Sequence, residues 1–443
     1  MNKSDKMANW PIVKLFFSMG IPAVFSMLIQ ALYNIVDTIY ISQYSQDALF
    51  AIGLVTPLQM VGLSIALGGG AGVATLVSRR LGEGEHDEAG NVVATGIILT
   101  IIHILAVVLL GIFVTKPFIG LFTDQSAVIK LGYDYLLIVM TICFGQHFAI
   151  LFERSFQAQG NMLIPMLSQL LGALTNIILD PILIFDFNLG IRGAAIATVA
   201  GQILSTLFLL LMLRTKHNEL KIHVFKHRFT LDRVGDIYNV GLPTMIMNAI
   251  GSFTTIMMNN ILIKFSTEAV SSLSIYFKVQ SFFFMPVFGF SQGAMPILSY
   301  NYGANNRKRF LMTLLTYLIS AVAIMSLGTI AFRFYPQIVL SFFEMDDVLR
   351  PVATEALRTI SICFVFAAVS IVMTTMLQSF GRGTLSMLQS ILRQIVVLIP
   401  VAYLLSRFGV LGYVWYAYPI AEILVMLLYI PISIKTYHNH FID

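Results

Sequence analysis

Charged residues are scarce in this chain. Only 11% of its 443 residues are Asp, Glu, Lys or Arg, whereas 57% are hydrophobic. A soluble protein carries about 25% charged residues, so this composition excludes an ordinary soluble domain. Cysteine is nearly absent as well, since the chain holds only Cys143 and Cys363, both within apolar stretches. Two such residues do not support a disulfide framework, and we expect both to be packed thiols.

The sequence also lacks the strict polar–apolar alternation of barrel strands. Solid apolar runs take its place, for example over residues 92–114 and 196–213. Runs of this length cross a bilayer as helices, so the chain is predicted to be an all-α integral membrane protein. Twelve transmembrane helices are expected, at residues 14–42, 51–78, 91–115, 128–152, 162–185, 190–213, 235–263, 269–299, 310–333, 351–377, 384–406 and 411–434.

The basic residues predict the orientation of these spans. Of 27 Lys and Arg residues, 17 lie on the side of the N-terminus, 7 lie in loops and helix ends on the other side, and 3 lie within spans. Short cytoplasmic loops carry the excess of Lys and Arg, so both termini are expected in the cytoplasm of a multi-pass cell-membrane protein. This bias accounts for the net charge of +5 without a nucleic-acid partner.

The two halves of the chain repeat one another. A shift of 221 residues aligns them over a long stretch, and the matched residues are mostly glycines and polar residues within apolar runs. Six spans in each half make these parallel repeats, related by an axis along the membrane normal, which is a transporter architecture. We therefore expect a six-helix lobe at residues 1–215, a basic cytoplasmic linker at 216–233 and a second six-helix lobe at 234–443.

Polar side chains gather at one depth of the first lobe. Tyr33 and Asp37 share a face of span one, and Asn176 and Asp180 share a face of span five. With Thr198 on span six, Asp37 and Asp180 lie roughly 9–12 Å below the outer membrane face. Intramembrane carboxylates are costly and mark functional sites. Two of them with amide and hydroxyl oxygens suit H⁺ or Na⁺, although helix-to-helix hydrogen bonding is the structural alternative.

Other polar groups in the spans have simpler interpretations. Pro181 directly follows Asp180 and is expected to free the carbonyl oxygen of Ile177. Arg393 and Glu422, in spans eleven and twelve, are expected to form an ion pair. The adjacent Glu153 and Arg154 are expected at the inner membrane interface. Polar residues within spans one, two, seven and eight are candidates for lining a substrate cavity: Gln30, Asn34, Gln59, Asn248 and Gln280.

Several segments resemble the multidrug and toxic compound extrusion (MATE) family. The stretch 30–37 with residues 48–57 resembles its first two helices, and the stretch 286–303 resembles its eighth helix and the loop that follows. Residues 157–161 resemble its loop between helices four and five. The resemblance implies a V-shaped, two-lobed bundle that alternates access, with a cation site at Tyr33, Asp37, Asn176, Asp180 and Thr198. It points to the prokaryotic branch with carboxylates in the N-terminal lobe, because residues 359–378 hold no Asp or Glu.

The sequence thus predicts a monomeric antiporter rather than an enzyme. It would export small amphipathic or cationic drugs in exchange for H⁺ or Na⁺, with Na⁺ bound at Asp37 and Asp180, and it would need no cofactor and no structural metal. A flippase for lipid-linked saccharides or peptidoglycan precursors, from the same superfamily, is the alternative. The pattern G-x-S-x-G at residues 289–293 lies inside a span, so it does not indicate a nucleophile elbow.

Overall fold

The computed structural model describes residues 3–215, 220–222, 229–341, 343, 345 and 347–441, and this part of the chain is helical without strands. The helices of the first half are α1 (Lys3–Asn9), α2 (Ile12–Tyr44), α3 (Gln46–Gly82), α4 (His86–Phe113), α5 (Thr115–Gly120), α6 (Ser126–Thr141), α7 (Phe144–Ala158), α8 (Leu163–Pro181), η1 (Ile182–Asp186) and α9 (Ile191–Leu213).

The second half repeats this order. Its helices are α10 (Leu231–Leu262), α11 (Thr267–Gly303), α12 (Arg307–Phe334), α13 (Pro336–Leu340), α14 (Leu349–Ile360), η2 (Ser361–Cys363), α15 (Phe364–Ser379), α16 (Gly383–Ile391), η3 (Leu392–Leu398), α17 (Ile399–Ser406), α18 (Leu411–Trp415) and α19 (Ala417–Phe441).

Twelve spans emerge from these helices. In the described residues, eleven helical segments are long and apolar enough to cross a membrane, and α6 and α7 form a twelfth that is bent by 47°. The twelve predicted spans are therefore confirmed. The fourth span bends between Thr141 and Phe144, a feature that the hydropathy of the sequence does not reveal.

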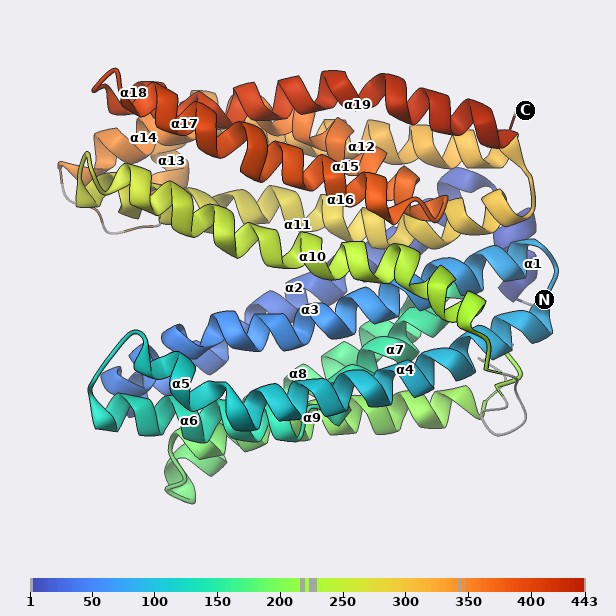
Figure 1. Cartoon of the computed structure of the whole chain (residues 1–443), viewed down its shortest axis with the longest axis horizontal. Coiled ribbons are helices and arrows are strands. Elements are labelled where there is room, and N and C mark those ends of the chain that lie inside the picture. The colour runs from blue at the N-terminus through green and yellow to red at the C-terminus, as the bar shows by residue number, and fades with distance from the viewer. Residues whose placement is uncertain are drawn as a thin grey trace.

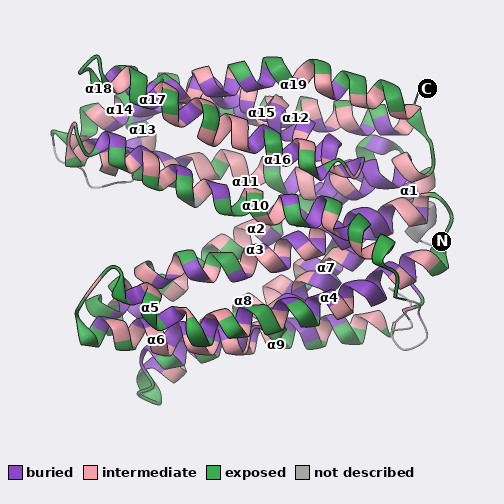
Figure 2. Cartoon of the chain, viewed as in Figure 1, coloured by how far each residue is buried: buried purple, intermediate pink, exposed green. Residues whose placement is uncertain are grey.

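The spans form two bundles, α2–α9 and α10–α19, called here the N-lobe and the C-lobe (Figure 1). The bundles meet near the two chain termini and diverge toward the opposite side, which gives the predicted V shape. We call these two sides the terminal end and the far end. Figure 2 shows buried residues concentrated where the lobes meet. Of the predicted linker at 216–233, residues 216–219 and 223–228 lie outside the described residues.

Repeated glycines bring the lobes together at the terminal end. A Cβ atom on Gly82 of α3 would collide with the carbonyl oxygen of Tyr300 on α11. A Cβ atom on Gly303 of α11 would collide with the carbonyl oxygen of Arg79 on α3. Under the shift of 221 residues, Gly82 corresponds to Gly303 and Arg79 corresponds to Tyr300, so the two contacts are equivalent. The two helices therefore cross with pseudo-two-fold symmetry, and only glycine permits this approach of the backbones.

A second glycine pair extends this contact toward the centre of the molecule. Gly72 of α3 packs against the backbone of Ile237 on α10, where a Cβ atom would collide with the carbonyl oxygen. The equivalent Gly293 of α11 lies against Gly20 of α2, with its ideal Cβ position 2.8 Å from the Gly20 Cα. We call these contacts of the α3 and α11 glycines with the opposite lobe the glycine seam.

Polar contacts between α4 and α10 reinforce the terminal end. Arg233 donates to both carboxylate oxygens of Glu88, over 2.8 and 3.1 Å. Closer to the centre, His103 Nε2 lies 2.7 Å from the hydroxyl oxygen of Tyr238. Each pair joins one lobe to the other, so the closed end is held by ionic and hydrogen-bonding contacts as well as by backbone packing.

The glycine seam predicts the effect of adding single methyl groups. Gly82→Ala and Gly303→Ala should each lower the thermal midpoint of the detergent-solubilised protein, because overpacking of a close contact costs about 1–3 kcal/mol. The two shifts should be similar, since the contacts are symmetric. Gly53→Ala is the matched control on α3, because its added Cβ would have no neighbour within 4 Å. Melting midpoints indistinguishable from that control would contradict the seam.

Candidate coupling site and central cavity

The polar cluster predicted for the N-lobe comes together in the structure. Asn176 and Asp180 lie one turn apart on α8, and Thr198 faces them from α9. Asn176 Nδ2 donates to Asp180 Oδ1 over 3.2 Å and to Thr198 Oγ1 over 3.3 Å. The solvent-exposed fractions of these three residues are 2%, 0% and 5%, respectively. The amide of Asn176 thus joins α8 to α9 inside the lobe.

Helix α2 adds the remaining members of the cluster. The carboxyl group of Asp37 interacts directly with that of Asp180. Tyr33, one turn earlier, lies within electrostatic range of both acids. All five predicted coupling residues therefore belong to one cluster, which is formed by α2, α8 and α9.

The cluster contains oxygens without a hydrogen-bond donor. Among the described residues, the buried atoms Asp37 Oδ1, Asp180 Oδ2 and Asn176 Oδ1 accept no hydrogen bond. Buried polar atoms are normally paired, and two adjacent carboxylates cannot both remain ionised in a low dielectric. A proton shared between the acids, or a monovalent cation bound among these oxygens, would compensate the unpaired oxygens and relieve the repulsion between the two carboxylates.

The local backbone at Asp180 is irregular. Pro181 ends α8, and the following residues Ile182–Asp186 form the π-helical turn η1. Proline removes one backbone donor, and π-helical turns are frequent at functional sites. The C-lobe carries a longer π-helical segment, Leu392–Leu398, in its corresponding span. A π-helical segment therefore occurs in the fifth span of each repeat, whereas the acids Asp37 and Asp180 occur in the N-lobe repeat.

Tyr135 is a member of the cluster that the sequence analysis missed. It lies on α6, only 3% exposed, shares a hydrogen bond with Thr198 and is within electrostatic range of Asp37. A depth estimate could have found it, because Tyr135 lies about 10 Å along its span from the far end.

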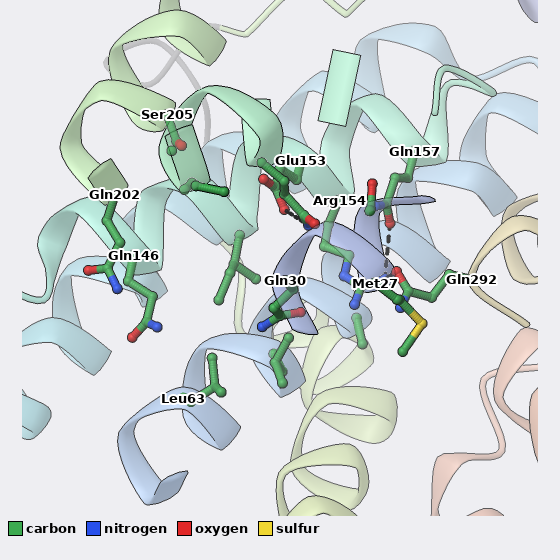
Figure 3. A pocket seen from close by; sticks show the side chains of 18 of the residues that line it. Met27, Gln30, Leu63, Gln146, Glu153, Arg154, Gln157, Gln202, Ser205 and Gln292 are labelled. Carbon is green, nitrogen blue, oxygen red and sulfur yellow. Dashed lines mark hydrogen bonds between the residues drawn. The ribbon is translucent and has the colours of Figure 1, made fainter. Parts of the chain in front are cut away.

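A cavity of about 520 Å³ lies beside the cluster and between the lobes (Figure 3). Tyr33, Asn176 and Thr198 line it, so the cluster borders this space. Further N-lobe lining residues are Ser26, Met27, Gln30, Leu63, Leu67, Ala71, Gln146, Ala149, Ile150, Glu153, Arg154, Gln157, Gln169, Gly172, Ala173, Gly201, Gln202 and Ser205, and the C-lobe adds Thr244, Asn248, Phe288, Ser291, Gln292, Met295 and Gln378.

The cavity includes only some of the residues proposed for it. Gln30 and Asn248 line it, whereas Asn34, Gln59 and Gln280 are not among its lining residues. Asn34 is solvent-exposed and lies one helical turn beyond Gln30 on α2, closer to the far end.

Glu153 and Arg154 differ more clearly from expectation. Both residues line this central cavity and Glu153 is only 8% exposed, which the sequence did not predict, whereas their depth relative to the membrane face stays a prediction. The bend between α6 and α7 lies within their span, and linear counting along that span did not account for it.

The expected ion pair of the C-lobe is formed. Arg393 Nη1 lies 3.2 Å from Glu422 Oε2, and the Glu422 side chain is 9% exposed. Neither residue lines the cavity. The pair joins η3 to α19, which is a structural contact within one lobe. No group of three or more His, Cys, Asp or Glu suited to a metal ion occurs in the described part of the chain.

The MatE family model matches residues 22–182 and 243–404, one segment in each lobe. The multidrug export protein MepA of Staphylococcus aureus (strain MRSA252) is 26% identical over 411 residues, which cover 91% of this chain and 90% of MepA. A MOP superfamily transporter from Pyrococcus furiosus shares the fold, with a TM-score of 0.92 at 22% identity and 99% coverage of both chains.

A further solved structure, the outward-facing conformation of a multidrug resistance MATE family transporter, aligns with a TM-score of 0.92 at 23% identity, again over 99% of each chain. At these identities the solved structures establish the fold alone. The family match covers most of the sequence and both repeats, which confirms the family predicted from the sequence. The chain therefore belongs to the MatE family of membrane transporters.

Proposed function

We propose that this protein exports small amphipathic or cationic compounds across the cell membrane in exchange for H⁺ or Na⁺. The observation that carries the proposal is a pair of neighbouring acids, Asp37 and Asp180, with buried oxygens that lack donors, beside a cavity between two lobes. The family match and the similarity to a multidrug export protein support the transport of small molecules.

The proposed orientation puts both termini in the cytoplasm, as the distribution of basic residues predicts. The terminal end is then the inner gate, and the conformation described above is closed toward the cytoplasm. Its similarity to an outward-facing relative supports this assignment. Export requires the opposite state as well, in which the glycine seam separates and the far ends of the lobes meet.

Ion binding drives the exchange in this proposal. A ligand shifts a conformational equilibrium only through different affinities for the two states. Uptake of H⁺ or Na⁺ by Asp37 and Asp180 from outside would remove their mutual repulsion and favour release of the substrate. Loss of the ion to the cytoplasm would restore the charges and favour renewed substrate binding. Because one chain provides both the cluster and the cavity, we expect the monomer to be the transport unit.

The coupling role predicts the effect of neutralising the acids. In proteoliposomes, Asp37→Asn and Asp180→Asn should each reduce gradient-driven efflux of a fluorescent cationic dye by about 5- to 150-fold, the range given by coupling free energies of about 1–3 kcal/mol. Asp47→Asn is the control, because it removes an exposed carboxylate from the first turn of α3. Full gradient-driven transport by the Asp37→Asn, Asp180→Asn double variant would refute the coupling role.

The same vesicles identify the coupling ion. A pH gradient and a Na⁺ gradient are imposed separately on the wild type, and dye efflux is expected with one of them. If neither gradient drives dye efflux and the protein scrambles a fluorescent lipid analogue, the result would instead support a flippase.

Tyr135 provides a more graded test. Tyr135→Phe removes the hydroxyl group that bonds to Thr198 and should raise the ion concentration needed for half-maximal transport about fivefold, since a lost buried hydrogen bond costs about 1 kcal/mol. Maximal transport should change little. The control is Tyr133→Phe, two residues earlier on α6, where the side chain has a different direction. Equal ion dependence of both variants would exclude Tyr135 from the site.

A further inference from the structure

Glu153 is an acidic group that the ion cluster does not use. It lies on α7, lines the cavity and is 8% exposed. Gln169 Nε2 donates to Glu153 Oε2 over 3.1 Å. Gln169 lies two helical turns before Asn176 on α8, a separation of about 10 Å. Glu153 is therefore a separate acidic position, nearer the terminal end of the cavity.

The guanidinium of Arg154 lies within electrostatic range of the Glu153 carboxylate but forms no salt bridge with it. Among the described residues, no ion pair joins Glu153 to a basic side chain. The neighbouring Arg154 instead donates to Gln157 Oε1 over 3.0 Å and to Gln292 Oε1 over 3.4 Å. A carboxylate removed from water is costly unless a cation or several donors compensate. Its position on a cavity wall allows that cation to come from the ligand.

The cavity is polarised around this acid. In Figure 3, Gln146, Gln202 and Ser205 lie to one side of Glu153, and Arg154 lies to the other side with Gln157 and Gln292. A positively charged group is repelled by the guanidinium of Arg154. It is therefore favoured on the side of Gln146 and Gln202, next to the carboxylate.

The rest of the lining specifies the kind of cation. Seven glutamines face the cavity: Gln30, Gln146, Gln157, Gln169, Gln202, Gln292 and Gln378. The buried Oε1 atoms of Gln169 and Gln202 accept no hydrogen bond from the described residues. Tyr33 and Phe288 are the aromatic members of the lining. An aromatic cage suits quaternary ammonium ions, whereas carboxylate and amide oxygens accept hydrogen bonds from cations that carry N–H donors.

We propose that Glu153 is the anionic contact for the charged group of the transported molecule, and that the cavity selects cations with N–H donors. Amidinium, guanidinium and primary ammonium compounds belong to this class, while quaternary ammonium and phosphonium ions do not. The inference rests on the proposed export function. The volume of about 520 Å³ lies within the range of sites for drug-sized ligands, about 300–1,000 Å³.

The test compares two organic cations on the full-length protein in detergent. The bis-amidine dye 4′,6-diamidino-2-phenylindole carries N–H donors, and tetraphenylphosphonium carries none. Glu153→Gln should weaken binding of the bis-amidine about tenfold or more, because charge-assisted hydrogen bonds are lost. Any binding of tetraphenylphosphonium should weaken much less, and a melting midpoint close to that of the wild type reports that the variant is folded. Glu153→Asp should retain part of the bis-amidine affinity.

A second variant keeps the proposal testable if Glu153→Gln does not fold. Gln202→Ala removes an acceptor without changing charge, and it should lower bis-amidine affinity several-fold and leave tetraphenylphosphonium binding unchanged. Equal losses for both cations, or none for the bis-amidine, would overturn the inference.

Gradient-driven efflux by the wild type distinguishes a failure of the recognition role of Glu153 from a failure of the proposed export function. If the wild type exports the bis-amidine and Glu153→Gln binds it normally, export stands and the recognition role falls. If the wild type neither binds nor moves either cation, both proposals fall.

Discussion

The close approach of α3 and α11 at the glycine seam is the contact on which the rest of the architecture depends. Two bundles packed along their full length would leave no room between them, and two bundles without a shared contact would not form one molecule. Gly82 and Gly303 allow backbone atoms of the two lobes to meet at one end only. The lobes therefore diverge from a fixed junction, and the space between them contains the cavity. Since the junction is built from one repeated contact, the pseudo-two-fold axis passes through it.

The chemistry of the two lobes is unequal although their backbones are alike. The repeat maps Asp37 onto Met258, which is completely buried, and Asn176 onto Val397. The C-lobe has instead the ion pair of Arg393 and Glu422, whose charges compensate each other. A neutralised pair has no need of an external ion, whereas two neighbouring acids do. In the proposed cycle, the ion gradient thus acts on the N-lobe, where the ion binds, and the N-lobe moves relative to the C-lobe.

The sequence predicts the fold well because hydropathy, the internal repeat and depth in the membrane can all be read from position along the chain. Hydropathy marks the spans, and the 221-residue shift identifies the glycines that later appear in the seam. Depth, counted at about 1.5 Å per residue, brings Asp37, Asp180 and Thr198 to one level. The same counting says nothing about the direction in which a side chain faces around its helix. Gln59 was therefore proposed for a cavity that it does not line. Asn34 lies one helical turn beyond the lining residue Gln30, and the cavity position of Glu153 was missed because α7 is tilted from α6.

Helix α8 connects the site proposed for the ion with the site proposed for the substrate. Asn176 holds Asp180 and Thr198, and Gln169, two turns away on the same helix, holds Glu153. The π-helical turn that follows Pro181 interrupts the regular α-helical hydrogen bonding at one end of this helix. A ligand at either site therefore acts on the same segment without touching the other ligand. Such coupling is reciprocal: the factor by which the ion weakens substrate binding is the factor by which the substrate weakens ion binding. The proposed exchange requires this relation, and one helix shared by two acidic positions provides a physical route for it.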